Sequence, residues 1–165
     1  MDEFILKTYN NLLKFSSTVL TLEKKIVDNR IENFENEIGF SLPKDFKYFI
    51  KNSNGFSLRA TSVNGIGEEY LENSLDKIYA FEHYETGNPM PQHFLPFSPD
   101  GFGNFYCLDL SRIENETCPI IFWQHDFIYD NLDEVETCNK NFAEWVNEVM
   151  IEWTLEEINF DGIEK

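Results

Sequence analysis

Residues 31–55 read IENFENEIGF-SLPKDFKYFI-KNSNG, and this stretch decides the first half of the fold. Apolar side chains recur at helical spacing over residues 27–38, and Gly39 stands where a glycine commonly ends a helix. Pro43 suits the first turn of a second helix, because its missing N–H has no partner there in any case. The stretch therefore predicts two amphipathic helices, the second ending at its Asn-Gly pair.

Toward the N-terminus, a further amphipathic helix is predicted over residues 2–15. Asp2 and Glu3 favour its start, because acidic side chains stabilise the N-terminal end of a helix. Residues 16–22 fit either a short strand or an extended link.

Downstream of residue 55, the pattern changes from helices to short strands. Residues 55–61 and 63–66 are predicted strands around an Asn-Gly pair. Residues 71–84 have helical spacing in part, with Asn73 or Ser74 able to cap a helix start.

A β-hairpin is predicted over residues 94–110. Its strands cover residues 94–98 and 104–110, and glycines in the turn at residues 99–103 supply the positive φ values that a tight turn needs. Pro96 places the first strand at a sheet edge or beside a bulge, since proline cannot donate a ladder hydrogen bond.

The last third of the chain combines strands with one long helix. Residues 119–123 are a predicted buried strand, and residues 127–129 are a further strand candidate. Apolar residues over 142–153 recur at helical spacing, and Asn141 with Glu144 resembles a capping box.

The order of these elements predicts an α+β fold. We expect one domain over residues 1–165, with an antiparallel or mixed sheet of about four to six strands flanked by helices. Its N-terminus is expected to be helical over residues 1–25. An amphipathic C-terminal helix precedes an acidic tail, residues 156–165, which we expect to fray.

Charge is the strongest feature of the composition. The 165 residues include 13 Lys and Arg but 30 Asp and Glu, a net charge of −17. Residues 1–51 are balanced, whereas residues 126–165 hold two basic and 12 acidic side chains. Such a field repels nucleic acid and anionic membranes and attracts basic partners.

Targeting and redox signals point to the cytoplasm. The chain begins Met-Asp-Glu-Phe, with acidic residues where a signal peptide is basic, and has no apolar run of the ~18 residues that a membrane helix needs. Its three cysteines are odd in number and form no C-x-x-C pair, which suits a reducing compartment.

No catalytic or metal-binding motif is found. The histidines, at positions 83, 93 and 125, lack the i, i+4 spacing of a helical metal site, so we expect neither a metal nor a cofactor. Cys107 and Cys118 lie in predicted strands and are interpreted as buried thiols. Residues 100–103, DGFG, are interpreted as a hairpin turn rather than an anion-binding or metal-binding loop. The three tryptophans, at positions 123, 145 and 153, are expected in the core.

A set of short runs, in order over about residues 28–150, resembles the SUKH superfamily and its Smi/Knr branch. The runs are Ile31–Gly39, Leu42–Ile50, Asn54-Gly55, Phe94–Phe97, Asp100-Gly101, Gly103-Asn104, Tyr106–Leu110, Pro119-Ile120, Phe122-Trp123, His125-Asp126 and Asn141–Trp145. Asn141 and Trp145 depart from the Ser and Phe of the family pattern, and the first 25 residues are not covered. The motif positions that look structural are Gly39, Leu42, Pro43, Gly55, Gly101, Gly103, Asp109, Trp123, Phe142 and Trp145.

The resemblance implies a non-enzymatic bacterial immunity protein that binds a cognate toxin in the cytoplasm. Many toxins paired with this family resemble nucleases, so the expected partner is a basic protein and not nucleic acid or a membrane. The chain itself is expected to be a monomer or a weak homodimer. An alternative is a regulatory interaction module that binds an endogenous protein. A small hydrolase using His125 and Asp126 is less favoured.

The variable acidic stretches are the candidate partner-binding positions, because an acidic face can occupy the basic cleft of a nuclease. They are Glu68, Glu69, Glu72, Asp76, Glu82 and Glu85 in the middle of the chain, and Asp126, Asp130, Asp133, Glu134 and Glu136 before the last helix.

Overall fold

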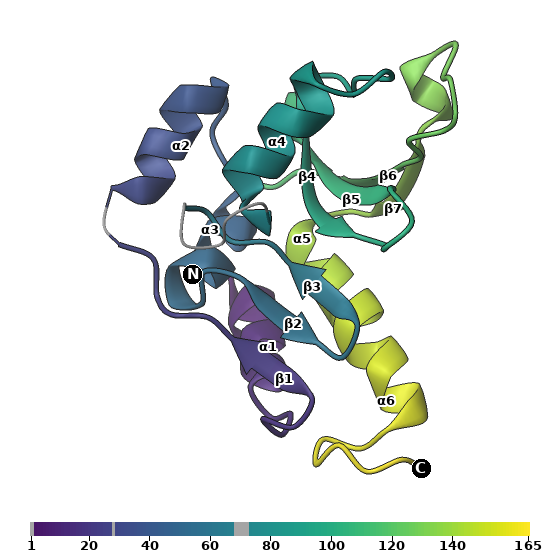
Figure 1. Ribbon diagram of the computed structural model, residues 1–165. Helices are drawn as coiled ribbons and strands as arrows, with labels where there is room; N and C mark the ends of the chain where they lie inside the picture. The colour runs from purple at the N-terminus through teal and green to yellow at the C-terminus, as the bar shows by residue number, and fades with distance from the viewer. Residues whose placement is uncertain (1, 28, 68–72) are drawn as a thin grey trace.

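The computed structural model describes residues 2–27, 29–67 and 73–165, and it has the predicted α+β architecture (Figure 1). The described helices are α1 (Glu3–Leu12), α2 (Arg30–Ile38), α3 (Lys44–Asn52), α4 (Leu75–Tyr84), α5 (Phe142–Trp145) and α6 (Trp153–Glu157). The described strands are β1 (Leu20–Leu22), β2 (Phe56–Leu58), β3 (Thr61–Val63), β4 (Phe94–Pro99), β5 (Phe105–Asp109), β6 (Ile120–Trp123) and β7 (Glu136–Asn139).

The strands form two antiparallel sheets within the described residues, in the orders β1-β2-β3 and β4-β5-β6-β7. The two sheets meet where the N–H of Asn64 donates to the carbonyl oxygen of Phe97 at 2.9 Å. The predicted hairpin β4–β5 is confirmed, with a bulge between Pro96 and Ser98. Proline is tolerated here because β4 is the end strand of its sheet and the ladder is already interrupted.

The three predicted helices over the first 55 residues are confirmed, but α1 ends at Leu12 rather than residue 15 and α2 begins later than predicted. Gly39 ends α2 at φ 79°, and its N–H donates to the carbonyl oxygen of Glu35 at 2.9 Å. That helix begins at Arg30, so Val27 lies outside it and is exposed to solvent. The ambiguous residues 16–22 contribute strand β1.

The prediction that the strands of residues 55–66 turn at Asn64-Gly65 is wrong. The chain reverses at Arg59, whose φ is 53°, and not at Asn64-Gly65. The side chain of Asn54 instead holds the backbone of Ile66, donating to its carbonyl oxygen and accepting from its N–H at 2.8 Å each. A Cβ on Gly65 would lie 2.2 Å from the Asn54 carbonyl oxygen, so this glycine permits close backbone approach.

The strand expected at residues 127–129 is absent from the described fold, and β7 takes its place at the edge of the sheet. The sequence of β7, Glu-Thr-Cys-Asn, is polar because most of this edge strand faces solvent. The apolar run at 127–129 belongs to an exposed loop instead.

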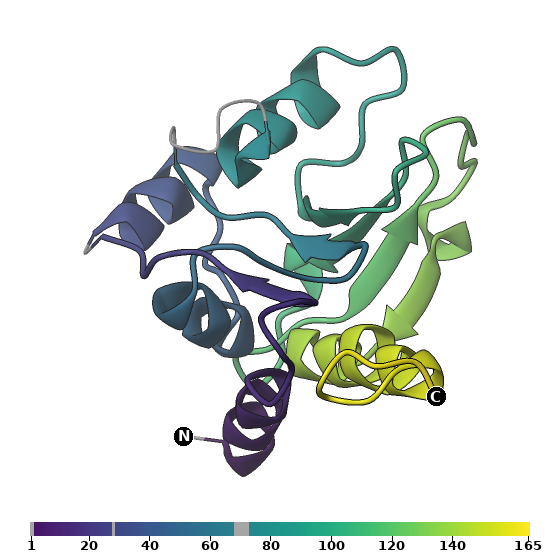
Figure 2. The same cartoon turned by 60° about the horizontal axis from the view of Figure 1, so that its bottom comes forward.

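The four-stranded sheet is covered on both faces. An inner cluster packs the sheet against α1, α3 and the C-terminal helix, which lies beneath the strands in Figure 2. The rings of Phe97 and Trp145 meet edge to face there, with centroids 4.8 Å apart. A smaller outer cluster lies on the opposite face, against Ile78 of α4; its buried members are Met90, Phe94, Phe105, Cys107, Ile121, Trp123 and Val135.

The C-terminal helix contains a π-helical segment, Val146–Glu152, between α5 and α6. A π-helix uses more residues per turn than an α-helix, so its buried positions recur every four residues. The buried positions at this spacing are Phe142, Val146, Met150, Thr154 and Ile158. The expectation of a buried Trp153 was wrong for this reason: the wider turns rotate it outward, and it is 49% exposed.

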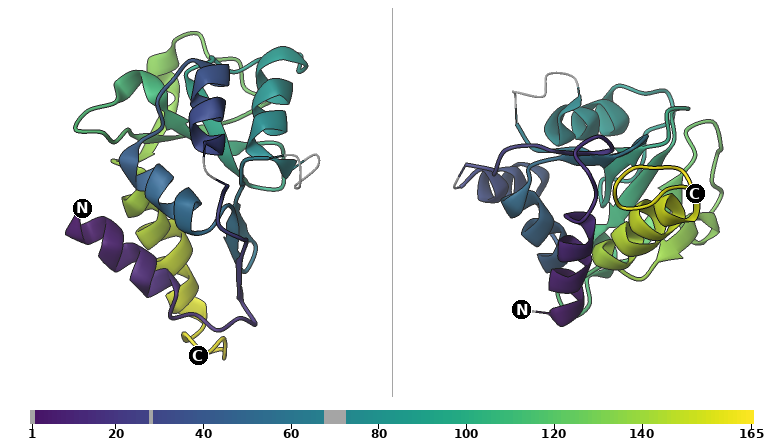
Figure 3. Two further views of the ribbon diagram at one scale, coloured as in Figure 1. Left: turned by 90° about the vertical axis from the view of Figure 1, so that its left-hand side faces the viewer. Right: turned by 90° about the horizontal axis from the view of Figure 1, so that it is seen from below.

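The acidic tail does not fray but folds back along the start of the chain. The N–H of Ser16 donates to the carbonyl oxygen of Phe160 at 2.7 Å, and the rings of Phe15 and Phe160 lie 4.8 Å apart. Figure 3 shows α1 and the C-terminal helix side by side. The N-terminal helix is thus part of the core, with Ile5 and Leu12 buried in the inner cluster.

Candidate interaction surface

Three of the side chains that sequence analysis considered for chemistry, His83, Cys107 and Cys118, are buried in the fold. Both ring nitrogens of His83 face backbone carbonyl oxygens, at 2.6 Å from Tyr79 and 3.0 Å from Pro91. Burial raises the pKa of the Cys107 and Cys118 thiols well above their usual range, which keeps them protonated and unreactive. In residues 2–27, 29–67 and 73–165, no three His, Cys, Asp or Glu side chains gather as metal ligands.

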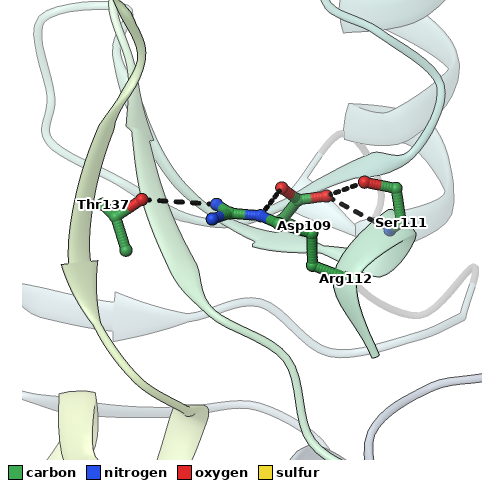
Figure 4. A network of polar contacts seen from close by, with 4 residues as sticks. All are labelled: Asp109, Ser111, Arg112 and Thr137. Atoms are coloured by element: carbon green, nitrogen blue, oxygen red, sulfur yellow. Dashed lines mark hydrogen bonds and ion pairs between the residues drawn. The ribbon is translucent and has the colours of Figure 1, made fainter. Parts of the chain in front are cut away.

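Asp109, at the end of β5, is the centre of a polar network (Figure 4). Its carboxylate accepts from the Ser111 hydroxyl and from Nε of Arg112, each at 2.6 Å. Nη2 of Arg112 in turn donates to Oγ1 of Thr137 on β7, at 3.3 Å. The network ties the end of one strand to the edge of the sheet.

A buried carboxylate that sequence reasoning missed, Asp45, joins the two halves of the chain. It is 0% exposed, and it accepts from the N–H of Ala143 at 3.0 Å and from the N–H of Phe46 at 2.9 Å. Desolvation raises the pKa of Asp45, although these N–H groups act in the opposite direction. In the sequence it looks like an ordinary acid in the first turn of α3.

Three loops are joined at one end of the four-stranded sheet. The side-chain amide of Asn88 donates to the carbonyl oxygens of His125 and Phe127, at 3.0 Å each. Oδ1 of Asn104 accepts from the N–H of His125 at 3.1 Å. A Cβ on Gly103 would lie 2.7 Å from the His125 ring, so only glycine lets the loops approach this closely.

Large apolar side chains project from these joined loops. Phe102 is 82% exposed and Ile128 is 79% exposed, and Phe127 is also exposed. Asp126 and Asp130 flank them and are exposed as well. We call these five residues the loop surface. Solvent-exposed apolar groups beside charges, on loops held by side-chain hydrogen bonds, are the composition of a protein-binding surface.

The predicted acidic positions are distributed unevenly. Asp126, Asp130, Asp133, Glu134 and Glu136 are all exposed and lie together on the β6–β7 connection and the start of β7. Glu85 is exposed at the end of α4, whereas Asp76 is partly buried and accepts from the N–H of Gly67 at 3.0 Å. Glu68, Glu69 and Glu72 fall outside the described residues.

Among the predicted acidic positions that the structure describes, Glu82 is the most deeply buried. It is 8% exposed, because α4 turns it toward the outer cluster on the sheet. Burial raises its pKa, and the charge of His125 acts against that shift.

The structure shows a second acidic region, on the C-terminal helix, that sequence analysis did not single out from the general negative charge of residues 126–165. An open groove of about 1220 Å³ runs between the C-terminal helix and β7. Glutamates line it at the same four-residue spacing as the buried positions, and they are Glu144, Glu148, Glu152 and Glu156. Some have local roles, because Glu148 accepts from the side-chain amide of Asn139 at 2.6 Å.

None of the described helices is both long and apolar enough to cross a membrane.

Comparison with solved structures finds the same fold elsewhere. A crystal structure of a protein from Pseudomonas syringae pv. tomato superposes with a TM-score of 0.61 at 14% identity, covering 92% of this chain and 99% of that one. No curated protein sequence matches.

Comparison with protein families gives a match over most of the chain. The sequence model of the SMI1 / KNR4 family (SUKH-1) matches residues 25–148. That range includes helices α2 to α4, strands β2 to β7 and the start of the C-terminal helix, and it leaves out α1 and β1. It nearly coincides with the runs over residues 28–150 that resemble the family. The chain therefore belongs to the SMI1 / KNR4 family (SUKH-1).

Proposed function

We propose that this protein is a cytoplasmic bacterial immunity protein that binds a cognate toxin and neutralises it by direct contact, without catalysis. The observation that carries the proposal is the loop surface, where Phe102, Phe127 and Ile128 stand exposed among aspartates. Burial of such side chains supplies the affinity of an interface, because a few desolvated aromatic and aliphatic anchors carry most of the binding energy.

The charge of the chain supports a basic partner, and a nuclease is the best-fitting class. A nuclease needs a basic cleft to hold phosphates, and the exposed acids Asp126, Asp130, Asp133, Glu134 and Glu136 can face such a cleft. Opposite charges at the rim of an interface mainly raise the association rate and select the partner. The aspartates and glutamates would therefore steer the encounter, and the apolar side chains would hold the complex.

Co-expression tests the proposal directly. The toxin encoded beside this gene is expressed in a host cell with and without the chain, and survival and formation of the complex are measured. We expect survival and a complex that copurifies. Continued killing despite abundant folded immunity protein would count against the proposal, and capture of an endogenous protein with no protection would favour the regulatory alternative.

Salt dependence tests the electrostatic part. The association rate with the purified toxin should fall steeply between low and physiological ionic strength, because salt screens charges at the rim. A rate that does not change over this range would contradict steering by the acidic face and would point to an apolar interface with another class of toxin.

A further inference from the structure

A cavity of about 740 Å³ lies between α4 and the hairpin β4–β5, where Figure 1 shows the helix above the strands. Pro99 and Phe105, which contribute to its wall, flank the turn that carries Phe102 of the loop surface. The cavity thus opens beside the surface that we propose to bind the toxin. Its remaining wall comes mainly from α4, through Ile78, Phe81 and Glu82.

The carboxylate of Glu82 is the unusual group in this cavity. The side chain is more than nine-tenths buried, yet in the described part of the chain it makes neither a hydrogen bond nor an ion pair. The titratable neighbour of Glu82, His125, is exposed, and Nδ1 of that histidine is 3.0 Å from Oδ1 of Asn104. No described protein group donates to this carboxylate and its oxygens are not enclosed, so they are available to a ligand that enters the cavity.

The other residues of the wall show what can lie around the Glu82 carboxylate. Apolar parts of the wall come from Ile78, the half-exposed Phe81, Pro99 and Phe105, and its other polar residues are Asn64, Asn73, Lys77 and Glu85. A ligand that fits must therefore carry a positive charge at its tip and an apolar stem.

An arginine side chain has this combination. Its three methylene groups can lie along Phe81 and Phe105, its guanidinium can donate two hydrogen bonds to one carboxylate, and its planar cation is favoured near aromatic faces. Lysine fits less well, because its ammonium is a strongly hydrated point charge that cannot make the paired contact.

We propose that the Glu82 cavity is a socket for one arginine side chain of the protein partner. The inference rests on the proposed function, since it adds one anchoring contact to the toxin interface. Lys77 and Glu85 also line the cavity, so the guanidinium would lie among charges of both signs and pair with Glu82.

The test is a titration followed by NMR of the backbone amides of the whole chain. The probe is N-acetyl-L-arginine methylamide, and the control ligand is the citrulline analogue, which has the same shape without the charge. We expect saturable shifts at Ile78, Phe81 and Phe105 with the arginine probe only. Equal binding of both ligands, or unsaturable shifts spread over the acidic faces, would overturn the socket.

Variants assign the binding to Glu82. Glu82→Gln should weaken binding of the arginine probe at least ~10-fold, whereas Glu37→Gln, the same charge change at an exposed position of α2, should leave it unchanged. Phe81→Ala gives a second test at an exposed residue, and it should weaken binding of the arginine probe roughly 3-fold. Unchanged binding in either cavity variant would refute the proposal.

The two proposals can fail separately. If the wild-type chain protects cells from the toxin but does not bind the arginine probe, the socket is wrong and the immunity role stands. If the probe binds at Glu82 but the chain gives no protection, the socket stands and its partner is not the neighbouring toxin.

Discussion

The two faces of the sheet β4–β7 bury their carboxylates in opposite ways. Asp45 belongs to the inner side, where two backbone N–H groups donate to it. One of them, the N–H of Ala143, lies in the first turn of the C-terminal helix. Glu82 belongs to the outer side and has no such donor in the described residues. The inner acid is held by hydrogen bonds of the fold, whereas the outer acid has none from the described residues and is the contact that we propose for the partner's arginine. Tyr129, next to the exposed apolar residues of the loop surface, packs against the outer cluster, so the proposed toxin-binding surface borders the outer side.

The largest expected effect is on the inner face. Asp45→Ala should lower the free energy of unfolding by about 2–3 kcal/mol, because it leaves the buried N–H of Ala143 without an acceptor. Urea unfolding followed by tryptophan fluorescence measures the loss. Asp45→Asn is the matched control and should lose less, since its single amide oxygen can still accept from one of the two N–H groups. A loss below about 0.5 kcal/mol for the alanine variant would show that Asp45 is not a structural tie.

The next effect concerns binding at the outer side. Ile128→Ala should weaken binding to the toxin by about 2 kcal/mol, roughly 30-fold, while the free energy of unfolding stays within about 0.5 kcal/mol of wild type. Isothermal calorimetry and urea unfolding separate the two quantities.

The control for this prediction is another exposed isoleucine. Ile163 lies in the C-terminal tail, away from the joined loops, so Ile163→Ala should leave affinity unchanged. Equal losses in both variants would argue against a localised interface at the loop surface.

A smaller effect of opposite sign is expected at Glu82. Glu82→Gln should raise the free energy of unfolding at neutral pH by about 1 kcal/mol, because it removes an unpaired buried charge. A loss of stability would show that Glu82 supports the fold, and the contrast between the two faces would then disappear.

The same pair of proteins gives a pH test. Because burial raises the pKa of Glu82, the folded state holds this proton more tightly than the unfolded chain does. Its contribution to stability is therefore complete below the unfolded pKa and is lost as the pH rises through the folded pKa. The stability advantage of Glu82→Gln should grow from acid to neutral pH, as urea unfolding over that range can show. The raised pKa of Asp45 is common to both proteins and cancels in the difference.

The sequence by itself determined most of the secondary structure, because the residues that begin and end helices and hairpins act locally. Gly39, Pro43 and Ser74 mark helix ends through their own backbone and side-chain chemistry, and the hairpin follows from glycines and a proline in its turn and strand. The sequence also determined the family resemblance and the acidic charge, both of which can be read without knowing what packs against what.

Tertiary structure decided the features that depend on distant partners. The polar strand β7 exists because β6 offers it an edge, and Trp153 faces outward because π-helical turns rotate it away from the core. In the sequence, Glu82 cannot be distinguished from an exposed acid of a helix. It is buried because α4 packs on the sheet. Burial is set by contacts between segments far apart in the chain, so no local pattern distinguishes a surface glutamate from one that lines a cavity.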